Sequence, residues 1–119
     1  MDQKEFDKIV VSCVAISNIL NEYYMLGILS VNEYDNRIQV QEYQFPIERI
    51  PGTLKVTNRN STHSAYDYSK EYLGKIFHFL SNDHPQDVAN KLNHLVTDLT
   101  NNFEINYLPE KGETNESSS

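Results

Sequence analysis

The sequence contains few of the residues from which small proteins usually build a reactive site. Its 119 residues include one cysteine, four glycines and no tryptophan. A single cysteine forms neither an intrachain disulfide nor a paired-cysteine zinc site, and the glycines are too scattered to cradle a phosphate. The chain has no Gly-x-Ser-x-Gly nucleophile elbow and no His-Glu-x-x-His motif. We therefore expect a non-enzymatic protein with no cofactor and no metal ion.

Basic residues are scarce as well. The chain has 10 Lys and Arg against 17 Asp and Glu, so its formal net charge is -7. Affinity for nucleic acid depends on Lys and Arg that neutralise phosphates, and the acidic balance argues against direct nucleic-acid binding. The same balance is compatible with simple solubility, and with an acidic surface that docks on a basic groove of a partner protein.

Long apolar runs are missing too. No run approaches the length of a membrane span, and no basic segment followed by an apolar stretch opens the sequence. We expect a cytoplasmic protein without membrane association. A chain of this length buries one core without disulfides, so residues 1–108 are predicted to form a single domain. Residues 109–119 are polar and are expected to be disordered.

Apolar residues recur at helical spacing over residues 2–23, which predicts an N-terminal helix. Asp2, with Glu5 three residues later, fits a capping box. The stripe is wide, which favours burial against a sheet and leaves a dimer partner as the alternative. In the first case Cys13 is a buried, inert thiol. The stripe consists of Phe6, Ile9, Val10, Cys13, Ile16 and Leu20, broadened by Val11, Val14 and Ile19.

The segment Tyr24–Tyr43 has two interpretations. Residues 38–43 alternate with a period of two, and Asp35-Asn36-Arg37 suits a turn, so a β-hairpin is favoured. A helical hairpin with its turn at Gly27 is the alternative. Farther on, Pro46 and Pro51 leave room for one helical turn at 46–49, and the β-branched run Thr53–Asn58 predicts a strand.

A second hairpin is predicted over residues 66–80, with Leu73-Gly74 as its turn; a longer loop is the alternative, because leucine is a poor first residue for a two-residue turn. Ser69 then lies opposite His78. A set of four aromatic residues shares the other face, where a core is favoured over a stacking platform for nucleic acid because only Lys70 and Lys75 lie nearby. A slip of one residue would change every one of these pairs. The aromatic residues are Tyr66, Tyr68, Phe77 and Phe79.

The last part of the chain predicts a helix over Ser81–Asn102, capped by Asp83, and a short strand over Phe103–Leu108. His94 and Asp98 would be one turn apart on that helix, with Asp87 on the same face. The predicted fold is α+β: an antiparallel sheet of about five strands, with the N-terminal and C-terminal helices packed on one face.

The stretch Pro51–Leu80 resembles small accessory proteins of phages and prophages of low-GC Gram-positive bacteria. Leu73 departs from the pattern, which usually has Asp there. The resemblance implies a mobile-element gene, and genes of this size resemble modulators of host machinery, among them anti-defence inhibitors such as anti-CRISPR proteins. It assigns no catalytic residue. The matching residues are Pro51, Gly52, Lys55, Val56, Arg59, Tyr66, Ser69, Lys70, Gly74, Phe77 and Leu80.

These observations together predict an interaction protein that blocks a basic surface of a bacterial host protein, in the cytoplasm of the host cell. One alternative is a structural or dimerisation module of a mobile element, in which case the protein is a homodimer. The other is a small-ligand-binding or enzymatic domain that uses His78 or His94. The candidate partner-binding residues are Glu33, Tyr34, Asp35, Asp67, Ser69, Glu71, His78 and Asp83.

Overall fold

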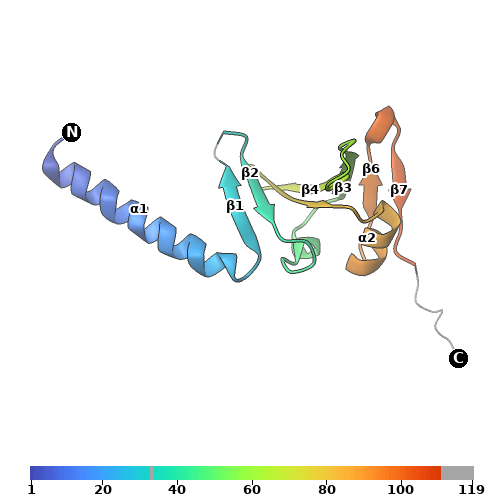
Figure 1. Cartoon of the computed structure of the whole chain (residues 1–119), viewed down its shortest axis with the longest axis horizontal. Coiled ribbons are helices and arrows are strands. Elements are labelled where there is room, and N and C mark those ends of the chain that lie inside the picture. Colours follow the sequence, from blue (N-terminus) through green and yellow to red (C-terminus); the bar gives the residue numbers. More distant parts are fainter. Residues whose placement is uncertain (33, 111–119) are drawn as a thin grey trace, which may run out of the picture.

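A twisted sheet and one long helix that leaves it make up most of the protein (Figure 1). The structure, a computed structural model, describes residues 1–32 and 34–110. The chain measures 68 × 36 × 27 Å and has a radius of gyration of 18.4 Å. A compact domain of this length has a radius of gyration of about 13.5 Å. The difference reflects the helix α1 (Gln3–Tyr24), whose N-terminus lies far from the sheet.

Seven strands form one mixed sheet in the order β1-β2-β5-β4-β3-β6-β7. β2 is parallel to β5 and β3 is parallel to β6, whereas the other four neighbouring pairs are antiparallel. The α+β class is therefore confirmed, but the prediction of about five antiparallel strands is met only in part, because the described residues form seven strands and two of the six neighbouring pairs are parallel. The strands are β1 Ile28–Asn32, β2 Arg37–Val40, β3 Leu54–Asn58, β4 Tyr66–Tyr72, β5 Lys75–Ser81, β6 Val96–Asp98 and β7 Ile105–Tyr107.

Both predicted hairpins are present. β1 and β2 form the first one, so the alternative of a helical hairpin is wrong. β4 and β5 form the second, with Leu73 and Gly74 between the paired strands. Ser69 lies opposite His78 and Tyr68 opposite Phe79, which is the predicted register. The predicted strands at 53–58 and 103–108 correspond to β3 and β7.

The second helix, α2, is shorter than predicted. It covers Pro85–Leu92, has His84 as its N-cap, and ends at Asn93, which adopts a left-handed φ of 51°. The chain then returns to the sheet as β6, whose β-branched residues pair with β3. The predicted second helix is therefore present, but its predicted extent over 81–102 and its predicted cap Asp83 are wrong.

α1 starts as predicted but does not pack as predicted. Asp2 Oδ1 accepts a hydrogen bond from the Glu5 amide at 2.7 Å, so the cap is formed. No residue of α1 is buried against any part of the chain that the structure describes, and Cys13 is exposed. The predictions that this helix covers the sheet and that Cys13 is a buried thiol are therefore wrong.

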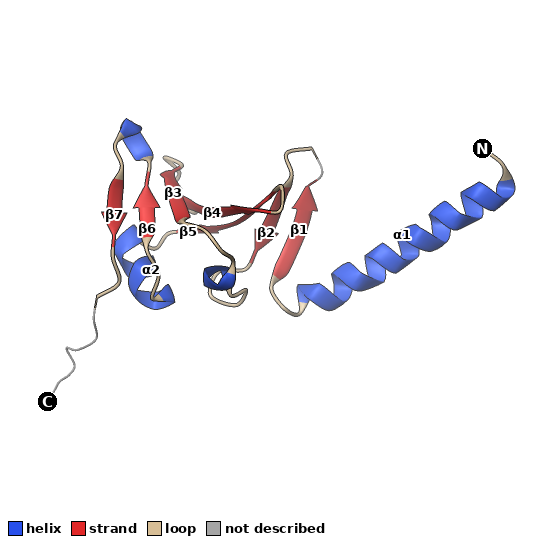
Figure 2. Ribbon diagram, turned by 180° about the vertical axis from the view of Figure 1, so that it is seen from behind, coloured by secondary structure: helices blue, strands red, loops and turns tan. Residues whose placement is uncertain are grey.

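The core explains why α1 lies outside. α2 and the 3-10 turn η1 (Ile47–Arg49) lie on one side of the sheet (Figure 2) and cover its apolar face. On the opposite face, Asp67 and Glu71 of β4 pair with Leu80 and Ile76 of β5, so polar and apolar side chains are mixed there and offer an apolar helix no continuous surface. At the junction, Gly27 has a φ of 99°, and a Cβ there would lie 3.0 Å from the backbone nitrogen of Phe45. Only glycine fits this turn, which directs α1 away from the sheet.

The apolar face of the sheet includes the predicted aromatic residues. The Tyr68 and Phe79 rings stack with centroids 5.0 Å apart, and both side chains are buried. Tyr66 and Phe77 pack against the same cluster. The interpretation of these four aromatic residues as core, rather than as a stacking platform, is confirmed. The buried apolar residues are Val40, Ile47, Leu54, Val56, Tyr68, Phe79, Val88, Ala89 and Val96.

Lys70 joins η1 to this face of the sheet. It is 2% exposed, and its Nζ donates hydrogen bonds to the carbonyl oxygens of Ile50 and Glu48. Burial lowers the pKa of Lys70 below its usual value, because desolvation disfavours the charged form. The lysine therefore satisfies two backbone carbonyls where the loop passes over β4.

The end of the described chain packs on α2. The backbone amide of Glu110 donates to Asn90 Oδ1 at 2.8 Å, and the Asn90 side chain donates to Glu110 Oε1 at 2.9 Å. The prediction of disorder concerned residues 109–119, of which 111–119 lie outside the described residues.

The turn between β4 and β5 gives a test of stability. Leu73 has a φ of 53°, its side chain is 83% exposed, and Gly74 has a φ of 78°. A left-handed conformation costs a residue such as leucine about 1–2 kcal/mol, whereas asparagine adopts it readily. We expect Leu73→Asn to raise the free energy of unfolding by about 1 kcal/mol, measured by urea denaturation. Leu73→Ala removes the same side chain but keeps the strain, so equal stability of the two variants would contradict this explanation.

Candidate functional site

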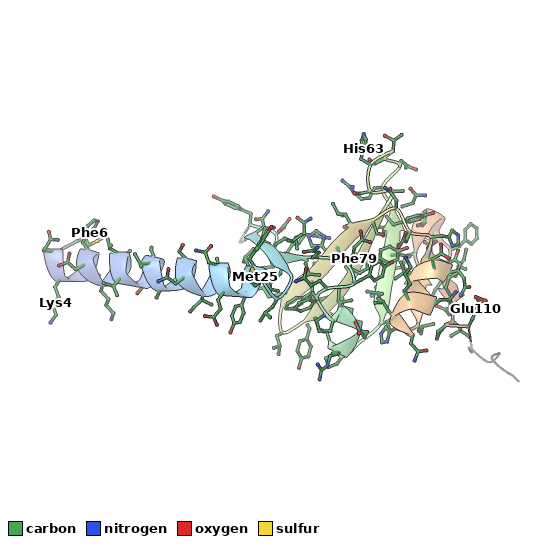
Figure 3. All side chains as sticks on the ribbon, turned by 60° about the horizontal axis from the view of Figure 1, so that its bottom comes forward. Lys4, Phe6, Met25, His63, Phe79 and Glu110 are labelled. Atoms are coloured by element: carbon green, nitrogen blue, oxygen red, sulfur yellow. The ribbon has the colours of Figure 1, made fainter. Side chains whose placement is uncertain are left out.

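One side of α1 carries an apolar surface that no other described part of the chain covers. Ten large apolar side chains of this helix are at least 40% exposed. Figure 3 shows that the helix, with Phe6 labelled near its N-terminus, extends well beyond the sheet. Folded monomers rarely expose contiguous apolar patches larger than a few hundred Å². The ten residues are Phe6, Ile9, Val10, Val11, Val14, Ile16, Ile19, Leu20, Tyr23 and Tyr24.

Six residues of α1 repeat with alternating spacings of three and four. This is the a/d pattern of a coiled coil, in which one narrow seam of each helix faces a partner. The wide stripe of this helix predicted packing against a sheet. The seven-residue repeat was readable in the sequence as well, and it is equally compatible with packing against another helix. The seam consists of Phe6, Ile9, Cys13, Ile16, Leu20 and Tyr23.

An apolar pocket lies at the foot of α1, where the helix meets the sheet. Its volume is about 570 Å³. Gln44 is a polar residue in its wall, and its Nε2 donates to the Met25 carbonyl oxygen at 2.9 Å, which holds the wall in place. The pocket begins at Tyr23, the last residue of the seam, so the two apolar surfaces are continuous. The lining residues are Tyr23, Met25, Leu26, Ile28, Gln44, Phe45 and Pro46.

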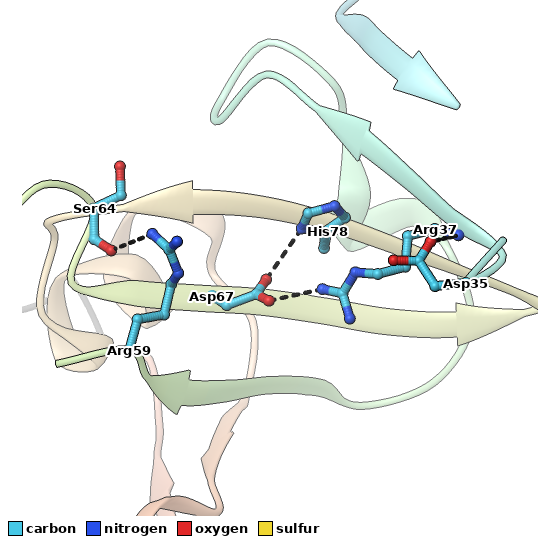
Figure 4. Close-up of polar contacts among 6 residues, drawn as sticks. All are labelled: Asp35, Arg37, Arg59, Ser64, Asp67 and His78. Atoms are coloured by element: carbon cyan, nitrogen blue, oxygen red, sulfur yellow. Dashed lines mark hydrogen bonds and ion pairs between the residues drawn. The ribbon is translucent and has the colours of Figure 1, made fainter. Parts of the chain in front are cut away.

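The polar face of the sheet brings together two predicted residues, Asp67 and His78, and one that was not predicted, Arg37. The Asp67 carboxylate lies 2.7 Å from Arg37 Nη2 and 3.2 Å from His78 Nδ1 (Figure 4). All three side chains are partly buried. The guanidinium neutralises Asp67, so this carboxylate is not a free acidic contact. The cluster ties β2, β4 and β5 together across the polar face.

The other predicted partner-binding residues are distributed over two sides of the sheet. Ser69 and Glu71 alternate with the core residues of β4 and so share the polar face with Asp67. Asp83 lies on the side of α2, where it accepts hydrogen bonds from Tyr43 Oη and from Lys91 Nζ. These two donors hold the pKa of the Asp83 carboxyl below its usual range.

The tip of the β1–β2 hairpin holds two more of the predicted residues. The Tyr34 side chain is fully exposed, and Asp35 Oδ1 accepts a hydrogen bond from the Arg37 amide at 3.2 Å. Glu33, the third predicted residue of this loop, lies outside the described residues. Tyr34 is therefore an aromatic side chain that contributes contact area only to something outside the chain.

His94 does not belong to the predicted helix face, because α2 ends at Leu92. It is half-buried between α2 and β6. Burial lowers its pKa, and the charge of Lys70 acts in the same direction; Glu48 and the Gly52 backbone oppose them. Among residues 1–32 and 34–110, no group of three or more His, Cys, Asp or Glu is placed to hold a metal ion. The helices in these ranges are all too short or too polar to cross a bilayer.

Comparison of the chain with protein-family models, with curated proteins and with solved structures gives no match. The function is therefore inferred from the geometry, with the exposed helix α1, the pocket at its foot and the tip of the first hairpin as candidate surfaces.

The lowered pKa of His94 predicts how stability depends on pH. The folded state disfavours the protonated imidazole, whereas the unfolded chain takes up this proton as the pH falls through the usual value of 6.5. The contribution of His94 to the free energy of unfolding is complete above that pH and is lost as the pH falls toward the lowered pKa. We expect His94→Gln to reduce the fall in unfolding free energy between about pH 7.5 and pH 5. His63→Gln, in an exposed loop, should leave the fall unchanged, and an unaltered slope in the His94 variant would contradict the assignment.

Proposed function

We propose that the protein is a non-enzymatic protein-interaction module whose docking element is α1. One observation carries this proposal: ten large apolar side chains on a helix of 22 residues have no cover within the described chain. Burying the exposed half of each releases about 1 kcal/mol, or about 10 kcal/mol in all. That is comparable with the cost of association, roughly 4–15 kcal/mol, so these side chains are sufficient to support binding.

The helix itself supports the same proposal. Isolated helices are marginal in water, and β-branched residues lower helix propensity further. The middle of α1 contains Ile9, Val10, Val11, Val14 and Ile16. Such a helix depends on packing rather than on its own propensity. Because the sheet does not supply this packing, a partner that covers α1 would stabilise the helical conformation.

Site-specific photo-crosslinking in cells tests the proposal. A photoreactive phenylalanine analogue at Val10, beside the seam, is expected to give a light-dependent adduct with a protein. The same analogue at Thr57, an exposed position on β3, is the matched control and should give no such adduct. If position 10 gives no adduct in cells in which the protein is folded, the proposal is wrong. The mass of the adduct distinguishes a second copy of the chain from a different protein.

A second candidate function follows from Tyr34 and the net charge of -7. A fully exposed tyrosine beside an acidic residue suits recognition of a protein, because tyrosine supplies contact area at a low entropy cost. We propose that this loop and the acids near it dock on a basic surface of a bacterial host protein and inhibit it. This second candidate function agrees with the resemblance to phage accessory proteins. The polar sheet face around Asp67 would be the surface next to the hairpin tip.

The hairpin tip can be tested separately from α1. A photoreactive analogue at Tyr34, in cells of a low-GC Gram-positive bacterium, should give one discrete adduct that disappears when Asp35→Lys reverses the neighbouring charge. The analogue at Phe103, an exposed aromatic residue just before β7 at the opposite edge of the sheet, serves as the control. An adduct at position 34 that persists with Asp35→Lys would show that acidity does not guide the contact.

A further inference from the structure

The seam of α1 is complementary to itself. Its spacings run three, four, three, four, three, so the seam reads the same from either end. A two-fold axis across the middle of the helix therefore brings every seam residue of one copy against a seam residue of the other. We propose that α1 is a dimerisation arm, on which a second copy of the chain packs in the antiparallel direction. This inference rests on the proposed function and names the partner.

The antiparallel register produces matched layers. Large residues meet at the two ends of the arm and smaller ones at its centre. A closed two-fold contact of this kind uses the same patch on both copies and leaves no surface open for further growth. Across the pair, Phe6 faces Tyr23, Ile9 faces Leu20, and Cys13 faces Ile16.

The pocket at the foot of α1 favours the antiparallel over the parallel arrangement. In the antiparallel register the first turn of the second copy reaches the foot of the helix, where Met1 arrives beside the apolar wall formed by Ile28, Phe45 and Pro46. Met1 is 81% exposed in the single chain. In a parallel pair the first turns would lie about 33 Å from both pockets, at 1.5 Å per residue.

The helix dipole points in the same direction. Antiparallel packing places the N-terminal end of each helix, which is the positive end of its dipole, next to the C-terminal end of the other helix, whose last turn contains no basic residue. A parallel pair would align the two dipoles and bring like helix ends together.

The available area is sufficient for a specific contact. Eight of the ten exposed apolar residues lie on the seam or beside it; Val11 and Val14 do not. At roughly 60 Å² each, they bury about 500 Å² per copy and about 1,000 Å² in total. This is the lower limit for a specific interface, so we expect a dimer that dissociates on dilution.

Sedimentation velocity of the full chain tests the dimer. Between about 1 and 100 µM, we expect a shift from the 13.8 kDa chain to twice that mass. Ile16→Glu places a charge in the seam and should weaken dimerisation at least tenfold. Val11→Glu places the same charge on the far side of the helix and should change it less than twofold. Circular dichroism checks that the sheet stays folded, as expected for positions outside its core. A monomer at every concentration, or equal effects of the two variants, would overturn the proposal.

Disulfide trapping tests the direction in a Cys13→Ala background. Ile9→Cys and Leu20→Cys are prepared as separate proteins, mixed and oxidised. The antiparallel pair predicts a covalent dimer in the mixture and little in either protein alone. A disulfide formed by Ile9→Cys with itself would show parallel packing and overturn the arrangement.

The outcomes separate this inference from the proposed function. If the chain stays monomeric while the analogue at Val10 crosslinks to a different protein, the dimer is wrong and the interaction module stands. If neither a dimer nor an adduct forms, both are wrong.

Discussion

The packing of the apolar face of the sheet against α2 and η1 is the interaction on which the rest of the structure depends. Tyr68 and Phe79 stack at its centre, and Lys70 ties the overlying loop to the same layer through two carbonyls. An eight-residue helix and one 3-10 turn are enough to close this layer. Because polar and apolar side chains are mixed on the opposite face, where Arg37 pairs with Asp67, this face offers α1 no continuous apolar surface among the described residues. The long N-terminal helix is consequently excluded from the core.

Local signals in the sequence predicted most of the sheet. The period-two alternation of residues 66–80 and the Leu73-Gly74 turn gave the central hairpin and its register, since a two-residue turn leaves little freedom in strand pairing. Asp2 and Glu5 correctly predicted the start of α1, because a helix cap depends only on residues within one turn of each other. The parallel pairings of β2 with β5 and β3 with β6 were not predicted, because they join segments far apart in the chain and no short motif encodes them.

The errors about helices share one cause. Apolar periodicity shows that a segment buries one side but does not say against what. Val96 lies at helical spacing from the apolar residues of α2. The helix ends at Asn93, however, and Val96 belongs to the strand β6, which pairs with β3. The stripe of α1 was predicted to face the sheet, although its seven-residue spacing suits a helical partner as well. The candidate sites were predicted in part. Asp67 and His78 do lie together, but Arg37 joins them from β2, and the pairing of β2 with β5 was not predicted from the sequence.

Gly27 has a consequence for how α1, the arm, is joined to the sheet. The arm and the sheet are joined through one residue with a positive φ, pressed against the Phe45 backbone with no space for a side chain. The direction of the arm therefore depends on the main chain at Gly27, together with the hydrogen bond from Gln44 to the Met25 carbonyl oxygen. A side chain at position 27 would force the backbone to change this angle and would thereby move the whole apolar arm relative to the sheet.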